Sequence, residues 1–361
     1  MVVIPRASAQ RVVFTQEIRM RMLKLKLASL ALAFSASMGA YAQEVTLRLH
    51  QFLPPQGTVP AKAFTPWAKK IEEDSKGRIK VQMYSSMQLG GTPPQLFDQA
   101  KDGVVDIIWT LPGYTPGRFP KSEVFELPFI AGLSAEKTSR ALWDYVQKNA
   151  MDEYKDVHVL ALHTHGPGLF HTKQPVANME SLRGMKIRGG TRVVNSMLTK
   201  LGATPVGMPV PAVTEALSKG VLDGTTIPWE VAPALKVQEL VKYHTTFTGD
   251  RALYVTTFVV AMNKNSYNKL PADLKKVIDD NSGAEFSAMI ARTQDVGDGL
   301  GRSLAVKNGN TISELNAAEV KRWRETAAAV ESEWVKEMQA KNIDGAKLLA
   351  DAKALVAKYD K

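Results

Sequence analysis

The sequence alternates between segments with the apolar pattern of a β-strand and segments with the pattern of an amphipathic helix. Two strand segments, 104–110 (VVDIIWT) and 253–262 (LYVTTFVVAM), are almost continuously apolar, which is typical of strands in a sheet that is covered on both faces. Helical patterns at 93–103 and 134–149 flank the first of them. Few folds accommodate this alternation, and it predicts an α/β protein built on parallel sheets.

Further elements follow the same alternation along the chain. We expect a strand from Glu44 to the Pro54-Pro55 pair, strands at 78–84, 158–164, 169–172, 185–188 and 242–246, and helices at 61–75, 191–201, 210–219, 231–240, 272–281, 283–307, 316–339 and 345–358. Three glycines, Gly297, Gly299 and Gly301, interrupt the helical pattern at 283–307. At 166–168 (GPG) the character of the sequence changes, and we expect the chain to cross there from one domain to another.

The segment 184–201 (GMKIRGGTRVVNSMLTKL) contains the first candidate for a binding residue. A short strand ends at Arg188, Gly189 and Gly190 follow, and a helix begins at Thr191. Open α/β sheets bind ligands beyond the carboxyl ends of their strands, and a guanidinium offers two parallel N–H donors that match a carboxylate. Arg188 is therefore a candidate for binding a carboxylate, although a surface position beside Lys186 explains it equally well from this segment alone.

The formal net charge of +10 is unevenly distributed along the chain. Residues 1–42 contain six Arg and Lys residues and one Glu, so this segment carries +5 and the remaining 319 residues carry the other +5. No cluster of Lys and Arg with interleaved aromatic residues occurs in residues 43–361. The composition therefore argues against nucleic-acid binding.

Residues 1–42 are expected to be a cleaved export signal. Basic residues precede a short apolar stretch at 27–34 (LASLALAF) and an A-x-A cleavage pattern that ends at Ala42. Met20 and Met22 are alternative initiators, in which case residues 1–19 form an untranslated leader. The chain has no cysteine for lipid attachment, and no later segment approaches 18 uninterrupted apolar residues. We expect a periplasmic protein that is not itself embedded in the membrane.

Residues that could support catalysis or bind a cofactor are few. His163, His165 and His171 lie close together in the sequence, but no carboxylate beside them has the spacing of a metal site. No cysteine nucleophile, G-x-S-x-G motif or glycine-rich phosphate loop occurs. We therefore expect no metal, no cofactor and no catalytic residue.

Aromatic residues are more informative about the ligand. They fall at strand ends or strand–helix junctions, where the cleft of an α/β fold is expected, at Phe52, Trp109, Tyr114, Phe170, Trp229 and Tyr254. Rings at such positions can hold an apolar or aromatic ligand while an arginine binds its carboxylate, and packing in the core is the alternative role for each of them. Glu230 is either a solvated carboxylate at a helix N-terminus or an acceptor for a ligand hydroxyl.

Three motifs carry a resemblance to a known family. They are LPGYTPGRFPKSEVFELPF at 111–129, LRGMKIRGGTRVVNSMLTKLGATPVGMPVPAVTEALSKGVLDG at 182–224 and MNKNSYNKLPADLKKVI at 262–278. From residue 43 onward the chain resembles the DctP-type solute-binding proteins of the tripartite ATP-independent periplasmic (TRAP) transporters. The resemblance implies a two-domain periplasmic-binding-protein fold with hinge strands. Domain I would comprise 43–165 and 254–293, domain II would comprise 166–253 and 294–361, and a long helix, either 283–307 or 316–339, would span both.

The resemblance also implies a function. The protein would be a monomer without enzymatic activity that binds a small carboxylate between its domains and delivers it to TRAP membrane permease subunits. Arg188 would be the family's carboxylate-binding arginine. The residues expected to contact the ligand are Arg188, Trp109, Phe170, Trp229, Asn195, Phe52, Tyr254 and Glu230.

Two departures from sialic-acid-binding members of the family bear on the ligand. Those members carry a second arginine near the position of Gly168, and an asparagine where this chain has 227–229 (IPW). The hydroxyls of a sugar acid would be buried without partners, at a cost of about 1–3 kcal/mol each. We expect an apolar or aromatic monocarboxylate, or a small 2-oxo or 2-hydroxy acid. The alternatives are a periplasmic lyase or dehydratase that uses Glu230 or His163 as acid or base, and a sensor subunit that presents ligand to a membrane receptor kinase.

Overall fold

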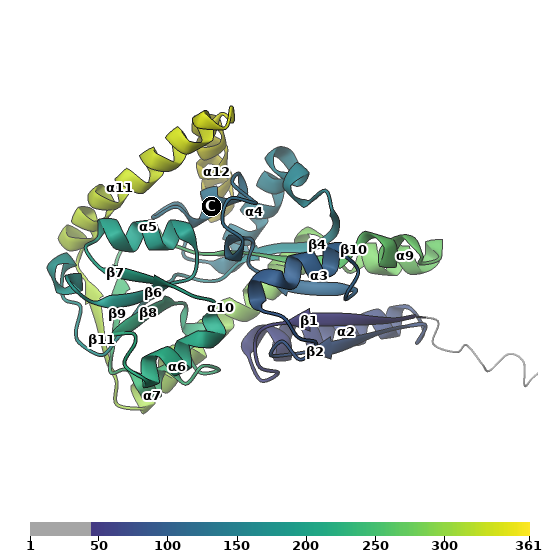
Figure 1. Ribbon diagram of the computed structural model, residues 1–361, viewed down its shortest axis with the longest axis horizontal. Coiled ribbons are helices and arrows are strands. Elements are labelled where there is room, and N and C mark those ends of the chain that lie inside the picture. Colours follow the sequence, from purple (N-terminus) through teal and green to yellow (C-terminus); the bar gives the residue numbers. More distant parts are fainter. Residues whose placement is uncertain (1–44) are drawn as a thin grey trace, which may run out of the picture. The chain divides into compact units, whose positions relative to one another are not determined.

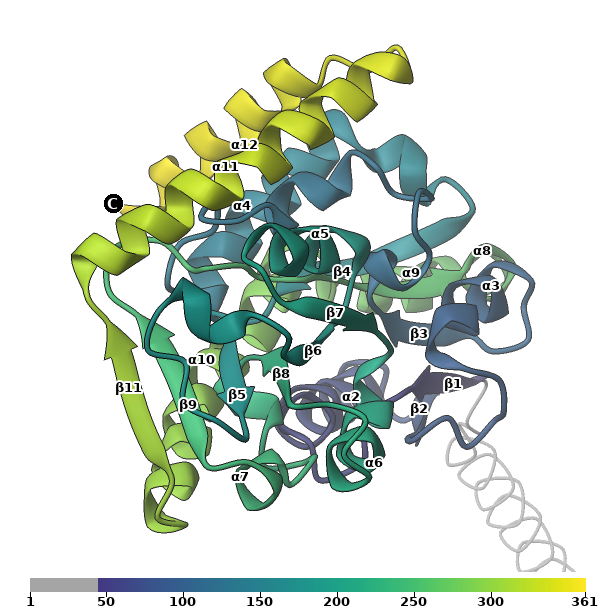
Figure 2. The same ribbon diagram turned by 60° about the vertical axis from the view of Figure 1, so that its left-hand side comes forward.

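Two β-sheets organise residues 45–361, the part of the chain that the computed structural model describes (Figure 1 and Figure 2). The first sheet has the strand order β2-β1-β3-β10-β4, and the second has the order β11-β9-β5-β8-β6-β7. The strands are β1 Val45–Gln51, β2 Ile79–Tyr84, β3 Ile107–Thr110, β4 Val157–Thr164, β5 Leu169–Thr172, β6 Lys186–Gly189, β7 Thr204–Gly207, β8 Gly224–Ile227, β9 Tyr243–Phe247, β10 Thr257–Asn263 and β11 Thr311–Leu315. The predicted signal peptide at 1–42 lies outside the described residues.

The predicted α/β fold class is confirmed, but both sheets are mixed, so the expectation that they are parallel holds only for some strand pairs. Strand β1 is parallel to β3, and β6 is parallel to β7 and β8, but β10 is antiparallel to β3 and β4, and β5 is antiparallel to β8 and β9. The path of the chain explains the reversal. Strand β4 leaves the first sheet at Thr164, the chain then builds most of the second sheet, and β10 returns at Thr257, directly opposite Thr164. Because β10 enters the sheet at the end at which β4 leaves it, the two strands run in opposite directions.

The helices lie close to their predicted positions, with a few differences. They are α2 Thr65–Asp74, α3 Leu96–Lys101, α4 Ala135–Asn149, α5 Arg192–Lys200, α6 Val213–Ser218, α7 Val237–Leu240, α8 Lys264–Asn268, α9 Ala272–Asp280, α10 Ala284–Lys307, α11 Ala317–Ala340 and α12 Gly345–Asp360. The helix expected at 231–240 is reduced to α7, because Lys236 has φ 56°, a left-handed conformation that a right-handed helix cannot contain. None of the helices in residues 45–361 has the length and apolar character needed to cross a membrane.

Helix α10 contacts elements of both sheets. Near its start, Ser287 Oγ accepts a hydrogen bond of 2.9 Å from the Leu162 N–H in β4. Near its end, a Cβ atom at Gly301 would lie 2.1 Å from the backbone oxygen of Trp229, just after β8. The helix runs without a break through Gly297, Gly299 and Gly301. Two of these glycines, Gly297 and Gly301, therefore permit a close approach of the chain at Trp229 and Glu230, and α10 fits the role of the predicted spanning helix.

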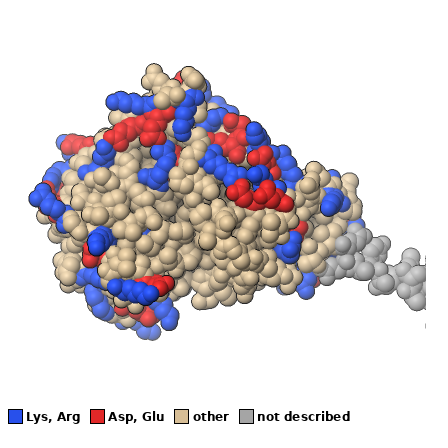
Figure 3. All heavy atoms as spheres, viewed as in Figure 1, with Lys and Arg blue, Asp and Glu red and all other residues tan. Residues whose placement is uncertain are grey.

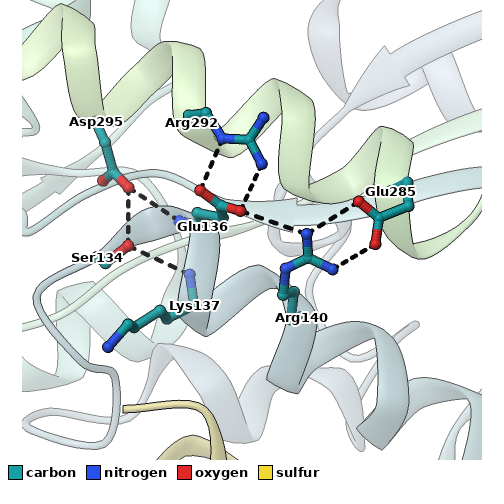
Figure 4. Close-up of polar contacts among 7 residues, drawn as sticks. All are labelled: Ser134, Glu136, Lys137, Arg140, Glu285, Arg292 and Asp295. Atoms are coloured by element: carbon teal, nitrogen blue, oxygen red, sulfur yellow. Dashed lines mark hydrogen bonds and ion pairs between the residues drawn. The ribbon is translucent and has the colours of Figure 1, made fainter. Parts of the chain in front are cut away.

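Polar contacts fix α10 to α4, the helix that precedes β4 (Figure 4). Arg292 donates two hydrogen bonds to Glu136, of 2.8 and 2.6 Å. Asp295 accepts hydrogen bonds from Ser134 Oγ (2.9 Å) and from the Ala135 N–H (2.7 Å). Since Ser134 is the N-cap of α4, Asp295 adds a negative charge where the helix dipole favours one. These contacts hold the first half of α10 against the layer that covers the first sheet.

The last helix, α12, also packs against α4. Lys358 donates to Asp144 (3.1 Å), and Lys148 donates to Asp351 (3.2 Å). Residues 294–361 are predicted to belong to domain II, whereas these contacts join the end of the chain to the helix that precedes β4. The domain boundaries at 165/166, 253/254 and 293/294 remain a prediction.

Candidate functional site

Arg188 lies near the end of β6 with its guanidinium buried. Its side chain leads away from Ile187, which faces the core, and the whole residue is 4% exposed. Nε donates a hydrogen bond of 2.9 Å to the backbone oxygen of Met208, and Nη1 donates one of 3.3 Å to that of Thr226. Gly190 leaves room for the guanidinium, because a Cβ atom there would lie 3.0 Å from Nη2. Within residues 45–361, no Asp or Glu side chain forms an ion pair with Arg188, so its charge has only neutral partners.

A cavity lies against this guanidinium, between residues that belong to or follow strands of both sheets. It contains about 440 Å³ of space not occupied by atoms, part of which is open to solvent. Its lining residues are Phe52, Leu53, Trp109, Leu111, Tyr114, His165, Arg188, Gly190, Val210, Thr226, Ile227, Pro228, Glu230, Val231, Tyr254, Thr256 and Phe258. A mainly apolar wall with few polar groups is typical of a site for a small organic molecule.

Stacked rings form one wall of the cavity. Trp109, at the end of β3, stacks on Phe52 with centroids 4.8 Å apart and on Phe258 with centroids 5.2 Å apart. The Trp109 indole N–H donates a hydrogen bond of 2.9 Å to His163 Nε2 behind the wall. Because this N–H is already satisfied, Trp109 presents an apolar surface to the cavity. Such a surface suits the body of an apolar or aromatic ligand.

Two tyrosines supply hydroxyl groups near Arg188. The Tyr114 hydroxyl accepts a hydrogen bond of 3.0 Å from the Val210 N–H and so joins the segment after β3 to the segment after β7. Burial raises the pKa of Tyr114 and raises that of Tyr254 to about 12, while the positive charge of Arg188 acts in the opposite direction on both. Both hydroxyls are therefore protonated at neutral pH and remain potential hydrogen-bond donors.

His165 also lines the cavity, but its ring nitrogens are both used within the protein. Nε2 accepts a hydrogen bond of 3.1 Å from the Thr256 N–H, and Nδ1 donates to the backbone oxygen of Gly166. Burial lowers the pKa of His165 to about 4, and the charge of Arg188 adds to this effect. The ring is therefore neutral. In the part of the chain that the structure describes, no group of three or more His, Asp or Glu residues has the arrangement of a metal site.

Glu230 contributes a buried carboxyl group to the cavity wall. Its Oε1 accepts a hydrogen bond of 2.9 Å from Gln294 Nε2 in α10, and its backbone N–H donates one of 2.8 Å to Asp298. Its backbone oxygen accepts a hydrogen bond of 3.0 Å from Thr58. Oε2 is buried and has no hydrogen-bond partner. Burial raises the pKa of Glu230 to about 7, because removal from water disfavours the ionised form.

Five of the eight residues expected to contact the ligand line this cavity: Arg188, Trp109, Phe52, Tyr254 and Glu230. The other three lie elsewhere. Phe170 packs on Trp323, with centroids 5.5 Å apart, and Trp229 packs on His171, with centroids 5.1 Å apart. Asn195 lies on α5 beside the backbone of Gly189. A ligand contact for each of the eight remains a prediction.

Tyr114 lines the cavity but is not among the eight residues predicted to contact the ligand. It belongs to the set of aromatic residues at strand ends, yet it does not follow its strand directly and lies in a short turn at Pro112–Tyr114. Leu53, Val210 and Thr226 carried no signal, because apolar and small polar residues of this kind occur throughout the chain.

Tyr254 packs against the backbone of Gly168. A Cβ atom at Gly168 would lie 2.2 Å from Cε1 of Tyr254, so the ring occupies the space that any side chain at 168 would need. The Gly168 N–H also donates a hydrogen bond of 3.0 Å to the Tyr254 backbone oxygen.

A charged contact outside the cavity joins the parts of the chain around the two sheets. Arg192, at the start of α5, donates two hydrogen bonds to Glu123, one of them 2.7 Å long, and a third of 2.8 Å to Glu337 in α11. Glu123 belongs to the segment 122–126, which also contains Glu126, a hydrogen-bond acceptor for Thr257 of β10. We call the pair of Arg192 and Glu123 the latch.

The two sheets, the cavity between their strand ends and the buried arginine define a solute-binding protein. The family described as "Bacterial extracellular solute-binding protein, family 7" matches residues 51–339. This chain belongs to that family, whose members are the substrate-binding proteins of TRAP transporters.

Three solved structures show the relationship in detail. A TRAP solute-binding protein from Rhodoferax ferrireducens T118, in complex with copurified benzoate, is 52% identical, with a TM-score of 0.86 over 88% of this chain and 98% of that chain. One from an unidentified marine microbe, described as specific for aromatic acid ligands and co-crystallised with 3-hydroxybenzoate, is 48% identical, with a TM-score of 0.87 over 89% and 100%. One from Bordetella bronchiseptica, with bound (R)- and (S)-mandelate, is 30% identical, with a TM-score of 0.80 over 87% and 99%.

Proposed function

We propose that this protein binds an aromatic monocarboxylate, with the carboxylate on Arg188 and the ring against Trp109. The observation that carries the proposal is the buried guanidinium of Arg188, which has only neutral partners in the described chain. A buried cation without an anion is costly, and a ligand carboxylate would supply the missing charge through charge-assisted hydrogen bonds. The hydroxyl of Tyr114 could donate to the same carboxylate.

The ligands of similar proteins support this assignment. Benzoate, 3-hydroxybenzoate and mandelate, which occupy the three solved relatives, each combine one carboxylate with one aromatic ring. The cavity here has matching parts, namely one arginine and a wall of stacked rings. A 2-hydroxy acid such as mandelate also belongs to the class that the sequence predicts.

In the proposed cycle, the exported, monomeric protein captures its ligand in the periplasm and presents it to the TRAP permease subunits. Ligand contacts from both sides of the cavity would favour a closed state by their differential affinity for that state. The protein would release the ligand unchanged. Positive and negative side chains are interspersed on the face shown in Figure 3. This distribution does not favour a nucleic acid as partner.

Calorimetric titration with benzoate tests the proposal. Replacing Arg188 with Ala removes two charge-assisted hydrogen bonds, so Arg188→Ala should raise the dissociation constant about 10- to 100-fold. Lys186→Ala is the matched control, since it removes a positive charge two residues earlier on the same strand at an exposed position. Its affinity should equal that of the wild type.

Three outcomes would contradict the proposal. The first is that no aromatic acid binds, and the second is that Arg188→Ala binds benzoate as tightly as Lys186→Ala does. The third is chemical conversion of the bound acid, measured by chromatography of the released ligand. Such conversion would favour the lyase alternative. That alternative has a poor base in His163, whose Nε2 accepts the Trp109 hydrogen bond and whose pKa burial lowers to about 3.

A further inference from the structure

Glu230 has a feature that the carboxylate-binding role of the cavity does not explain. Among the lining residues, its Oε2 is the buried side-chain oxygen that lacks a hydrogen-bond partner in the described chain. Buried polar atoms in folded proteins almost always have partners, and an unpaired one costs about 1–3 kcal/mol. Glu230 is 4% exposed, so bulk water does not satisfy this oxygen.

The rest of Glu230 is held in place. Its backbone N–H bonds Asp298 and its backbone oxygen bonds Thr58, while Oε1 bonds Gln294. Behind it, a Cβ atom at Gly297 would lie 2.9 Å from the Glu230 Cβ, so α10 supports the residue closely. Oε2 is thus the one hydrogen-bonding position of the carboxyl group that the protein leaves open. A group fixed in this way on a cavity wall is preorganised for a ligand.

Glu230 and Arg188 are separate polar groups of the cavity wall. Arg188 bonds the backbone oxygen of Thr226, and Glu230 lies four residues further along the chain, a span of at most about 14 Å when extended. No ion pair joins the two side chains within residues 45–361, because Arg188 bonds backbone oxygens and the Glu230 carboxyl group bonds Gln294. A ligand with its carboxylate on Arg188 would therefore meet Glu230 with the far side of its ring.

We propose that Glu230 selects aromatic acids that carry a hydroxyl group on the ring at a position remote from the carboxylate. This inference rests on the proposed function and specifies its ligand class. A hydroxyl group is both a donor and an acceptor, so it can pair with Oε2 whether Glu230 is ionised or protonated. A methyl group or an unsubstituted ring would leave Oε2 unpaired, and a second carboxylate would be repelled by an ionised Glu230.

The test compares three ligands of the same shape class on the wild-type protein. Calorimetric titrations with 3-hydroxybenzoate, 3-methylbenzoate and benzoate should give a dissociation constant about tenfold or more lower for the hydroxylated acid, because only its hydroxyl satisfies Oε2. 3-Methylbenzoate matches the hydroxylated acid in size, so a preference over it reports hydrogen bonding and not volume. 4-Hydroxybenzoate and 2-hydroxybenzoate then locate the hydroxyl, and the 2-isomer should show no advantage because its hydroxyl stays beside the carboxylate.

The variant Glu230→Leu should abolish the preference for 3-hydroxybenzoate over 3-methylbenzoate. Glu230→Gln keeps an oxygen acceptor and the contact with α10, so it should retain part of the preference, and it serves if the leucine variant does not fold. Equal affinity of the wild type for 3-hydroxybenzoate and 3-methylbenzoate, or an unchanged preference in Glu230→Leu, would overturn the inference. Loss of all aromatic-acid binding, or binding that does not depend on Arg188, would instead overturn the proposed function.

Discussion

At the scale of single residues, the cavity combines a cation without an anion and a carboxyl oxygen without a donor. Arg188 could be selected from the sequence because a strand end followed by two glycines is a recognisable pattern. The sequence predicts a ligand contact for both Glu230 and Trp229. Neighbouring side chains point to different sides of the chain, and of these two only Glu230 lines the cavity. The sequence shows that a residue lies at a strand end. Which of two neighbouring residues faces the cavity depends on how α10 packs against this segment.

Buried carboxyl groups also determine how stability should vary with pH. Glu126 is 1% exposed and accepts two hydrogen bonds from Thr257 through one oxygen. Burial raises its pKa to about 7, and the neighbouring negative charge of Glu123 adds to the shift. The folded state therefore binds this proton more tightly than the unfolded chain does, so the stabilisation is complete below the unfolded pKa and is lost as pH rises through about 7. Burial raises the pKa of Glu153 and Asp298 as well, to about 7 and about 8.

We predict that the free energy of unfolding decreases from about pH 7 to about pH 8, and that Glu126→Gln shows a smaller decrease. At lower pH the buried histidines act with the opposite sign, because burial lowers the pKa of His163 to about 3 and that of His165 to about 4. Urea unfolding at constant ionic strength measures both slopes. Glu180→Gln is the control, because Glu180 is exposed and bonds Arg322, which lowers its pKa. Identical slopes for Glu126→Gln and the wild type, or stability that increases over this range, would contradict the assignment.

At the scale of elements, the glycines of α10 show what a sequence pattern cannot reveal. Their spacing suggests an interrupted helix, yet α10 is continuous, and Gly301 lies against the backbone of Trp229. Periodicity predicts that a helix forms but not which of its faces another chain segment approaches. In the same way, β7 and β11 were not predicted, because most of their residues are exposed or half-buried and show no apolar pattern.

Two alanine substitutions in α10 should have opposite effects. At Gly299 no atom lies within 4 Å of an added Cβ, so Gly299→Ala should stabilise the protein by about 0.5–1 kcal/mol through helix propensity. At Gly301 the added Cβ would collide with the Trp229 backbone, so Gly301→Ala should destabilise by about 1–3 kcal/mol and weaken ligand binding by displacing Glu230. Urea unfolding and benzoate titration measure these effects. Equal stability of the two variants would show that the close approach is absent in solution.

At the scale of the whole molecule, the chain crosses between the two sheets more than once, and this path decides strand direction. The domain crossing expected at 166–168 remains a prediction, and at this point the chain passes from β4 of the first sheet to β5 of the second. The return of β10 between β3 and β4 could not be predicted from apolar patterns, because they carry no information on the order or direction of strands. Contacts such as the latch, which join the segments around the two sheets, are equally invisible in the sequence.

The latch should contribute to ligand affinity. Arg192→Ala removes two hydrogen bonds to the buried carboxyl group of Glu123. The arrangement in which segments of both sheets surround the cavity therefore loses stability. We predict a dissociation constant for benzoate raised about tenfold or more. Arg322→Ala is the matched control, since its partners Glu180 and Glu319 lie in the segment 179–182 and in α11, away from the first sheet. Equal affinities of the two variants would show that the latch does not act on binding.

A crystal structure of the protein with bound benzoate would test the central claim most directly. The account predicts that both carboxylate oxygens lie within hydrogen-bonding distance of the Arg188 guanidinium, with the ring against Trp109 and its far side toward Glu230. A benzoate bound in the cavity with its carboxylate away from Arg188, or bound at another site while the cavity stays empty, would contradict it.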